Sequence, residues 1–255
     1  SHNANYTIFV AEVASTVNEL LLAHKKLREG TSTDEKLSIL DGLMETYKGT
    51  LYRQTMFAEF EKNAHALCEK GEPLTAELLN KTYMKLIKAY FGPKVWKDKQ
   101  IAYEWMRIPH FYSNFYVYKY ATCISAASAI VKRIETEGAS YVDQYIEFLK
   151  CGGSKSPLES LLVAGIDMRD PSVVNGAIED FASAIREFKE IYKAGKGLPI
   201  NNTPVAIADI KNYKYGIENT ARIISFNTLL PKQVIRDMGR VLNLNSIGNN
   251  IKVTS

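Results

Sequence analysis

The hydrophobic pattern of residues 6–194 has the period of helices. Apolar side chains recur every three or four positions, which is the spacing of a helix with one stripe facing a core. This pattern predicts helices over 6–28, 34–48, 52–71, 73–90, 123–138, 141–150, 157–164 and 171–192. No convincing run of strands occurs in 1–194, so the fold class is predicted to be all-α.

Turn and capping residues punctuate these helices. Thr75 is the predicted N-terminal cap of the fourth helix, and Gly92-Pro93 ends it. Pro109 marks a break, because the residue before a proline is pushed out of the α region. We therefore expect one segment to end at Arg107 and Ile108, with His110 on a loop or at the start of the next helix.

The aromatic stretch Tyr103–Ala121 concentrates the groups most able to do chemistry. It reads YEWMRIPHFYSNFYVYKYA. At helical spacing, Tyr112, Phe115 and Tyr116 would fall on one stripe, with Tyr118 on a neighbouring face. A histidine and several tyrosines that converge on a cleft can hold a peptide carbonyl and its developing oxyanion. The alternative is an aromatic-rich core helix with phenols bonded to nearby backbone, and composition alone favours this alternative.

Glu12 is a carboxylate in an apolar setting, between Val10-Ala11 and Val13-Ala14. Such a group must be paired, hydrogen-bonded or bound to metal to offset its desolvation. Glu19 lies seven residues later, hence on the same side of the predicted helix. Taken by itself, a salt bridge to a neighbouring helix is favoured for Glu12 over a role as a ligand.

Composition narrows the setting of the protein. The 255 residues contain no apolar run of eighteen, so no transmembrane helix is expected, and no signal peptide is visible. Three widely spaced cysteines form no zinc-type pair and no disulfide framework, which predicts a reducing, cytoplasmic location. Residues 195–255 carry a net charge of +5, against −1 for the rest. We therefore expect a helical region over 1–194 and a distinct basic tail, of mixed structure, over 195–255.

Five blocks of the sequence resemble one protein family, in the family's own order. They are FVAEVASTVNE (Phe9–Glu19), YRQTMFAEFE (Tyr52–Glu61), EWMRIPHFYSNFYVYKYAT (Glu104–Thr122), FLKCGGSKSPLESLLVAGIDM (Phe148–Met168), and the closing helix. Residues 6–194 thus resemble the C-terminal half of the catalytic domain of oligoendopeptidase F, a zinc metallopeptidase of the thimet type. The resemblance implies the helical half of a zincin-type oligopeptidase that hydrolyses short peptides.

The same resemblance implies roles for individual residues. In the family three protein ligands leave an open zinc position for a water molecule, which attacks the peptide carbonyl. Glu12 corresponds to the third zinc ligand, which reverses the preference for a salt bridge. The resemblance also implies that His110 and Tyr118 donate hydrogen bonds to the oxyanion and that Tyr112 and Tyr116 line the peptide. Glu19 is implied to orient one of the zinc ligands.

One family feature is missing from the sequence. H-E-x-x-H would supply the other two zinc ligands and the general base, yet the only histidines are His2, His24, His65 and His110. We therefore expect this polypeptide to be an inactive fragment on its own. Zinc and peptide hydrolysis would require a partner chain or the N-terminal half of such an enzyme.

The tail contains a second resemblance. Lys214–Asn245 is similar to a block in the palm region of bacterial DNA polymerase III α subunits. Lys232, Arg236 and Arg240 could contact phosphates there, although a solvated helix face is the favoured interpretation. Two alternatives to a peptidase therefore stay open: a non-catalytic helical module that binds peptides or a partner, and, less favoured, a nucleic-acid-binding protein.

Overall fold

The structure is a computed structural model, and it describes residues 6–30 and 32–196. That part of the chain contains helices and no strand, so the predicted all-α class is confirmed. Each of the eight predicted helices is present, with ends that differ by a few residues. The expectations for the tail, including the polymerase-like block and the boundary at 194, concern residues that lie almost wholly outside the described ranges.

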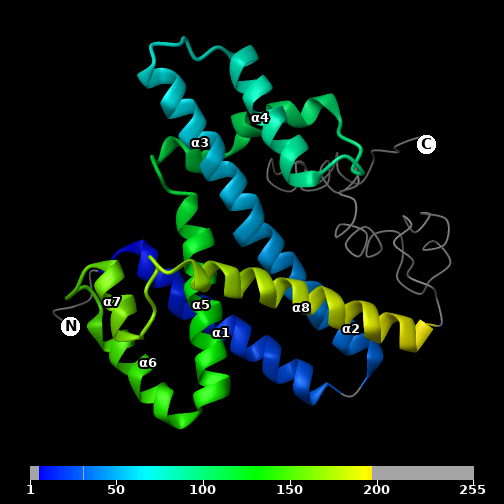
Figure 1. The fold of residues 1–255 in the computed structure, drawn as a ribbon, viewed down its shortest axis with the longest axis vertical. Helices are drawn as coiled ribbons and strands as arrows, with labels where there is room; N and C mark the ends of the chain where they lie inside the picture. Colours follow the sequence, from blue (N-terminus) through cyan, green and yellow to red (C-terminus); the bar gives the residue numbers. More distant parts are fainter. Residues whose placement is uncertain (1–5, 31, 197–255) are drawn as a thin grey trace. The chain divides into compact units, whose positions relative to one another are not determined.

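The described residues form two compact units, and we describe each by itself. Of the described residues, unit 1 holds those up to Thr55 and 117–196, whereas unit 2 runs from Met56 to Tyr116. Unit 1 contains α1 (Ile8–Glu29), α2 (Thr33–Tyr47), η1 (Lys48–Tyr52), the start of α3 (Arg53–Glu69), α5 (Tyr118–Glu137), α6 (Ala139–Cys151), α7 (Pro157–Val163) and α8 (Pro171–Lys196) (Figure 1). Unit 2 contains the rest of α3, α4 (Ala76–Phe91), and the 3₁₀-helices η2 (Lys99–Arg107) and η3 (Pro109–Tyr112).

Helix α5 is the centre of unit 1, in contact with α1, α6 and α8. Small side chains let its neighbours approach closely, and Ala126 and Ala127 are fully buried. Two buried hydroxyls on this helix are hydrogen-bonded, as buried polar groups must be. Ser125 Oγ donates to the Ala121 carbonyl at 2.7 Å, and Ser128 Oγ donates to Asp180 on α8.

Helix α2 continues into α3 through η1, a π-helix, without the break that the sequence suggested between residues 48 and 52. One extra residue per turn leaves Leu51 buried, and its carbonyl accepts a 2.6 Å bond from Thr55 Oγ1. The two predicted helices are therefore one helical run with a local π-bulge.

The C-terminal end of α7 is secured by side chains from α5 and α6. Arg133 Nη1 and Tyr141 Oη both donate to the Ala164 carbonyl, at 3.2 and 2.8 Å, and the guanidinium lies 4.1 Å from the centre of the Tyr141 ring. Gly165 follows with φ at +72°, and a Cβ there would lie 2.2 Å from Arg133 Nη1. The left-handed backbone favours glycine here, and any larger residue would also displace the end of the Arg133 side chain.

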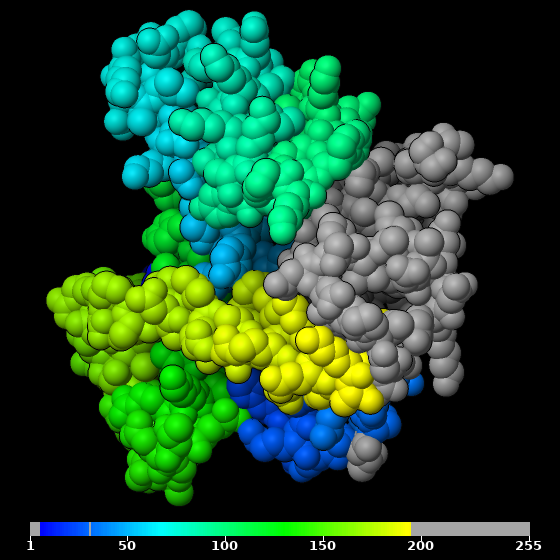
Figure 2. Space-filling model, turned by 45° about the vertical axis from the view of Figure 1, so that its right-hand side comes forward, coloured from blue at the N-terminus to red at the C-terminus, as the bar shows by residue number. Residues whose placement is uncertain are grey.

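Helix α8 lies along the surface of unit 1 as a continuous ridge (Figure 2). Its inner face buries Val173, Ala177 and Phe188, while outward positions carry exposed charges such as Glu179 and Arg186. This division is the amphipathic pattern of a helix that covers a core. Across the described ranges no helix is both long enough and apolar enough to cross a membrane.

Unit 2 has an aromatic core with a buried polar network beside it. The rings of Phe60 and Tyr83 meet edge to face, 5.2 Å between centroids. Tyr83 Oη donates to Glu104 Oε2 at 2.6 Å, and Arg107 Nη2 donates to Glu104 Oε1 at 2.8 Å. The predicted cap also holds, since Thr75 Oγ1 accepts from the Leu78 N–H at 3.2 Å. Glu104 thus ties α4 to η2.

The buried pair predicts a large loss of stability on substitution of Glu104. Glu104→Leu removes both acceptors and leaves the Arg107 charge, whose side chain is 9% exposed, without its carboxylate. We expect the free energy of unfolding to fall by about 3–5 kcal/mol in urea denaturation followed by circular dichroism. The control is Glu147→Leu, which breaks the exposed pair with Lys150 and should cause no measurable change. Equal midpoints for the two variants would contradict a buried Glu104.

Candidate functional site

Two 3₁₀-helices and a proline place His110 in unit 2. Helix η2 ends at Arg107 as predicted, and Ile108 before Pro109 has ψ at 103°, an extended conformation. The next ring, Phe111, is anchored on α3 at 5.4 Å from Phe60, between centroids. His110 stacks on Tyr116, with 5.3 Å between centroids and 28° between planes. The structure therefore brings together two of the predicted site residues, an imidazole and a phenol.

Residues 113–117 form a turn, which corrects the expectation of one helical aromatic stripe. Helix α5 begins at Tyr118, five residues earlier than the sequence suggested, but the turn precedes it. Phe115 has φ at 55°, so the side chains of Tyr112 and Tyr116 do not share a helix face. A bulky residue in this left-handed region costs roughly 1–2 kcal/mol of backbone strain. Tyr112 is 86% exposed and stands apart from the His110 and Tyr116 pair.

Two groups on α3 contact this turn. The Phe115 N–H donates to Glu61 Oε1 at 2.7 Å, and the Phe115 ring stacks on His65 with 4.7 Å between centroids. Glu61 is buried, at 7% exposure. The His65 ring is therefore engaged in an aromatic contact with the turn.

Glu12 lies in unit 1 near the start of α1, half-buried beside Cys123 of α5. Cys123 Sγ donates to the Phe9 carbonyl at 2.8 Å, which shows that the first turn of α1 meets the second turn of α5 here. Burial, and next the negative charge of Glu12, raise the pKa of the Cys123 thiol to about 12. The salt bridges among the described residues do not include Glu12, so the salt-bridge alternative has no support there.

Glu19 and Tyr118 complete the predicted set in unit 1. Glu19 is exposed two turns further along α1, roughly 10 Å from Glu12 along the axis at 1.5 Å per residue. It could orient a ligand only if that ligand came from another segment. Tyr118 is the first residue of α5, about one and a half turns before Cys123, and is partly exposed.

The described residues do not fit a zinc ion by themselves. They contain no group of three or more His, Cys, Asp or Glu side chains that could hold a metal. A catalytic zinc site takes three protein ligands, and Glu12 is the one implied ligand in this part of the chain. Any complete site would need ligands from elsewhere.

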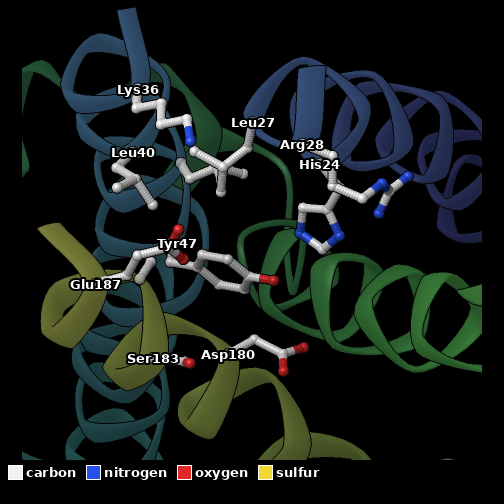
Figure 3. A pocket seen from close by; sticks show the side chains of 11 residues that line it. His24, Leu27, Arg28, Lys36, Leu40, Tyr47, Asp180, Ser183 and Glu187 are labelled. Atoms are coloured by element: carbon white, nitrogen blue, oxygen red, sulfur yellow. The ribbon is translucent and has the colours of Figure 1, made fainter. Parts of the chain in front are cut away.

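A pocket of about 400 Å³ opens in unit 1, and none of the predicted site residues lines it. It is lined by side chains of α1, α2 and α8, among them His24, Arg28, Lys36, Tyr47, Asp180 and Glu187 (Figure 3). Most of its polar groups are engaged: His24 Nδ1 and Arg28 Nη1 lie 3.1 and 2.5 Å from Glu135, and Tyr47 Oη donates to Ser128 Oγ at 3.4 Å. Burial raises the pKa of Tyr47 to about 12, which keeps the phenol neutral. These contacts describe a polar seam that joins four helices rather than a catalytic centre.

Comparison with known proteins identifies the family. Residues 1–179 match the family described as Peptidase family M3. This chain belongs to peptidase family M3. It is 49% identical to Oligopeptidase PepF of Bacillus subtilis over 187 residues. This aligned stretch covers 73% of this chain and 28% of the relative. The chain is 45% identical over 193 residues to an oligoendopeptidase F homolog of Borreliella burgdorferi, 74% of this chain and 32% of that protein.

A solved oligoendopeptidase-F shares the fold. The crystal structure of oligoendopeptidase-F from Enterococcus faecium superimposes with a TM-score of 0.71 at 41% identity, over 74% of this chain and 36% of that one. The predicted resemblance to oligoendopeptidase F is thereby confirmed. The chain spans about a third of the length of these relatives.

Three residues that did not stand out as site residues in the sequence are Glu61, His65 and Cys123. Glu61 and His65 contact the turn that contains Tyr116, and Cys123 is affected by the charge of Glu12. Glu61 carried a signal, because it is an acidic residue directly after Phe60 on the apolar side of α3. Cys123 carried none, since a small buried residue in a helix is ordinary. Their contacts depend on segments that are distant in sequence.

The electrostatic effect of Glu12 on Cys123 predicts a change in thiol reactivity. Glu12→Gln removes a negative charge that raises the Cys123 pKa, so the pH at which Cys123 becomes alkylated should shift downward. We would measure iodoacetamide labelling of the native chain from pH 8 to 11 by mass spectrometry, with the exposed Cys68 as internal reference. Glu19→Gln is the matched control and should leave the profile unchanged. Identical profiles for both variants would show that Glu12 does not face the thiol.

Proposed function

We propose that this chain supplies the C-terminal part of the catalytic domain of an M3 oligopeptidase, which cleaves short peptides once its site is complete. The match to relatives named as oligopeptidases, over the helices that carry Glu12 and His110, supports this most strongly. Peptide cleavage needs hydrogen-bond donors aimed at the oxyanion that develops on the attacked carbonyl. In this chain His110 and Tyr118 have that role, and Tyr112 and Tyr116 line the peptide.

Glu12 would be the acidic zinc ligand of the completed site, and Glu19 would orient another ligand. When bound, zinc supplies a Lewis acid and an activated water. The described part of this chain does not hold the ion alone. Its own contribution is therefore to present one carboxylate from α1 and to bind and orient the peptide through the aromatic side chains.

Exposed apolar side chains support the need for further protein. Ile8 and Leu22 on α1 are 44% and 54% exposed, and α6 and α7 add Ile146, Leu149, Leu158 and Leu162. Apolar surface of this kind marks interaction sites. Because the chain spans about a third of its relatives' length, we propose that the remainder of an M3 catalytic domain, in the same or another chain, covers these side chains.

A non-catalytic module that binds peptides through the His110 and Tyr116 pair is the second candidate. It is favoured by one observation, the lack of a metal-holding group in the described residues. Nucleic-acid binding through Lys232, Arg236 and Arg240 stays a prediction about residues that the structure does not describe. Cytoplasmic location also stays a prediction.

A chimera tests the leading proposal. The segment of Bacillus subtilis Oligopeptidase PepF that aligns with this chain is replaced by the matching residues of this chain. We expect the chimera to bind one zinc and to hydrolyse a quenched fluorescent peptide. Glu12→Gln should abolish both properties, whereas His110→Ala should keep the zinc and lower kcat by about 100- to 1000-fold, as removal of an oxyanion donor does.

A substitution at an exposed position of α3 is the control. Glu69→Gln, on an exposed position of α3, should leave activity and zinc content unchanged. A folded chimera that binds zinc yet hydrolyses no peptide would contradict the catalytic proposal and favour the peptide-binding module. Full zinc occupancy in the Glu12→Gln variant would exclude Glu12 as a ligand.

A further inference from the structure

We infer that Glu61 is a positioning residue that sets the shape of the turn at residues 113–117, and through it the placement of Tyr116 for peptide binding. The inference deepens the proposed function and rests on it for the peptide, although the hold on the turn stands on its own contacts. No family resemblance assigned a role to Glu61. The contacts that carry the inference all lie within unit 2.

The turn contains the one residue other than glycine with positive φ in the described ranges, Phe115 at 55°. A residue with a Cβ avoids this region, and a bulky aromatic residue rarely occupies it. Such a conformation persists only where surrounding contacts over-determine it. Something outside the turn must therefore hold Phe115.

Glu61 supplies that hold from α3. Its Oε1 accepts the Phe115 N–H at 2.7 Å, and hydrogen bonds from backbone N–H groups to carboxylates are stronger than those to neutral acceptors. The carboxylate is buried, so water competes little for the same N–H. Its helix is fixed in turn, because Phe57 and Phe60 pack in the aromatic core of unit 2.

His65 adds a second contact one helical turn later. Its ring stacks on the Phe115 ring at 4.7 Å and 28°. Residues four apart on a helix point to the same side, so Glu61 and His65 act on Phe115 together. Glu61 binds the backbone N–H of Phe115, and His65 packs against its side chain.

The consequence reaches the candidate site through the next residue. Tyr116 follows Phe115 directly and stacks on His110 at 5.3 Å. If Phe115 relaxed to negative φ, the peptide plane before Tyr116 would turn and the phenol would leave the imidazole. Glu61 touches no substrate in this arrangement; it acts through Phe115 on the side chain that does.

The first experiment measures the turn in the full chain, without any ligand. Chymotrypsin cleaves after Tyr112, Phe115 and Tyr116 only where the turn opens, and mass spectrometry follows the products. Glu61→Leu removes the acceptor, so we expect cleavage at these sites to accelerate by about tenfold or more, the effect of losing one charged hydrogen bond. Glu61→Gln keeps an amide oxygen at the same place and should restore the slow wild-type rate.

Matched variants separate this role from general destabilisation. Glu69→Leu makes the same change at an exposed position of α3 and should not alter cleavage. Glu61→Asp keeps the charge but is one methylene too short to reach Phe115, and it should behave like Glu61→Leu even if the leucine variant fails to fold. Thermal melts confirm that each variant is folded at the assay temperature. Wild-type cleavage rates in both Glu61→Asp and a folded Glu61→Leu would overturn the inference.

A second readout ties the turn to peptide chemistry in the PepF chimera. Glu61→Asp should lower kcat/KM by about tenfold with zinc content unchanged, while Glu61→Gln should recover it. If the unsubstituted chimera cleaves no peptide, the proposed function fails while the chymotrypsin result still decides whether Glu61 holds the turn. If the turn opens in Glu61→Asp but kcat/KM does not change, the positioning role for catalysis is excluded.

Discussion

Close packing around α5 is the constraint on which unit 1 depends. A helix with neighbours on several sides needs small side chains where they approach most closely, and Ala126 and Ala127 meet this demand with no exposed surface. Because the same helix begins at Tyr118 and places Cys123 against α1, its position also fixes where Glu12 lies. The core and the candidate zinc ligand are therefore set by one packing arrangement rather than by separate features.

The sequence predicted the helices of this M3 chain well, because helical periodicity is a local property. Pro109 gave the break before His110 and Thr75 gave a cap, and both follow from the chemistry of single residues. The failure came at residues 113–117. Aromatic spacing continues through them as if they were helical, but the backbone at Phe115 is decided by Glu61, 54 positions earlier. No pattern in a local window contains that information.

The candidate site divides in the same way. The apolar setting of Glu12 was readable, because its neighbours in sequence are apolar, but its actual neighbour Cys123 comes from a distant helix. The sequence showed that His110 and several tyrosines are close along the chain. The stacking of His110 on Tyr116 depends on the turn at residues 113–117, which helical periodicity does not predict. Resemblance gave the family, which physical reasoning from one sequence could not.

The bond between Glu61 and Phe115 has a further consequence for the conditions under which the protein keeps its shape. Dissolved ions screen exposed charges over a Debye length of about 8 Å at physiological ionic strength, and surface pairs such as Arg186–Glu179 weaken as salt rises. A carboxylate that is buried and bound to a backbone N–H is largely shielded from those ions. The turn at residues 113–117 should therefore keep its conformation in concentrated salt, whereas the exposed ion pairs on the helices weaken.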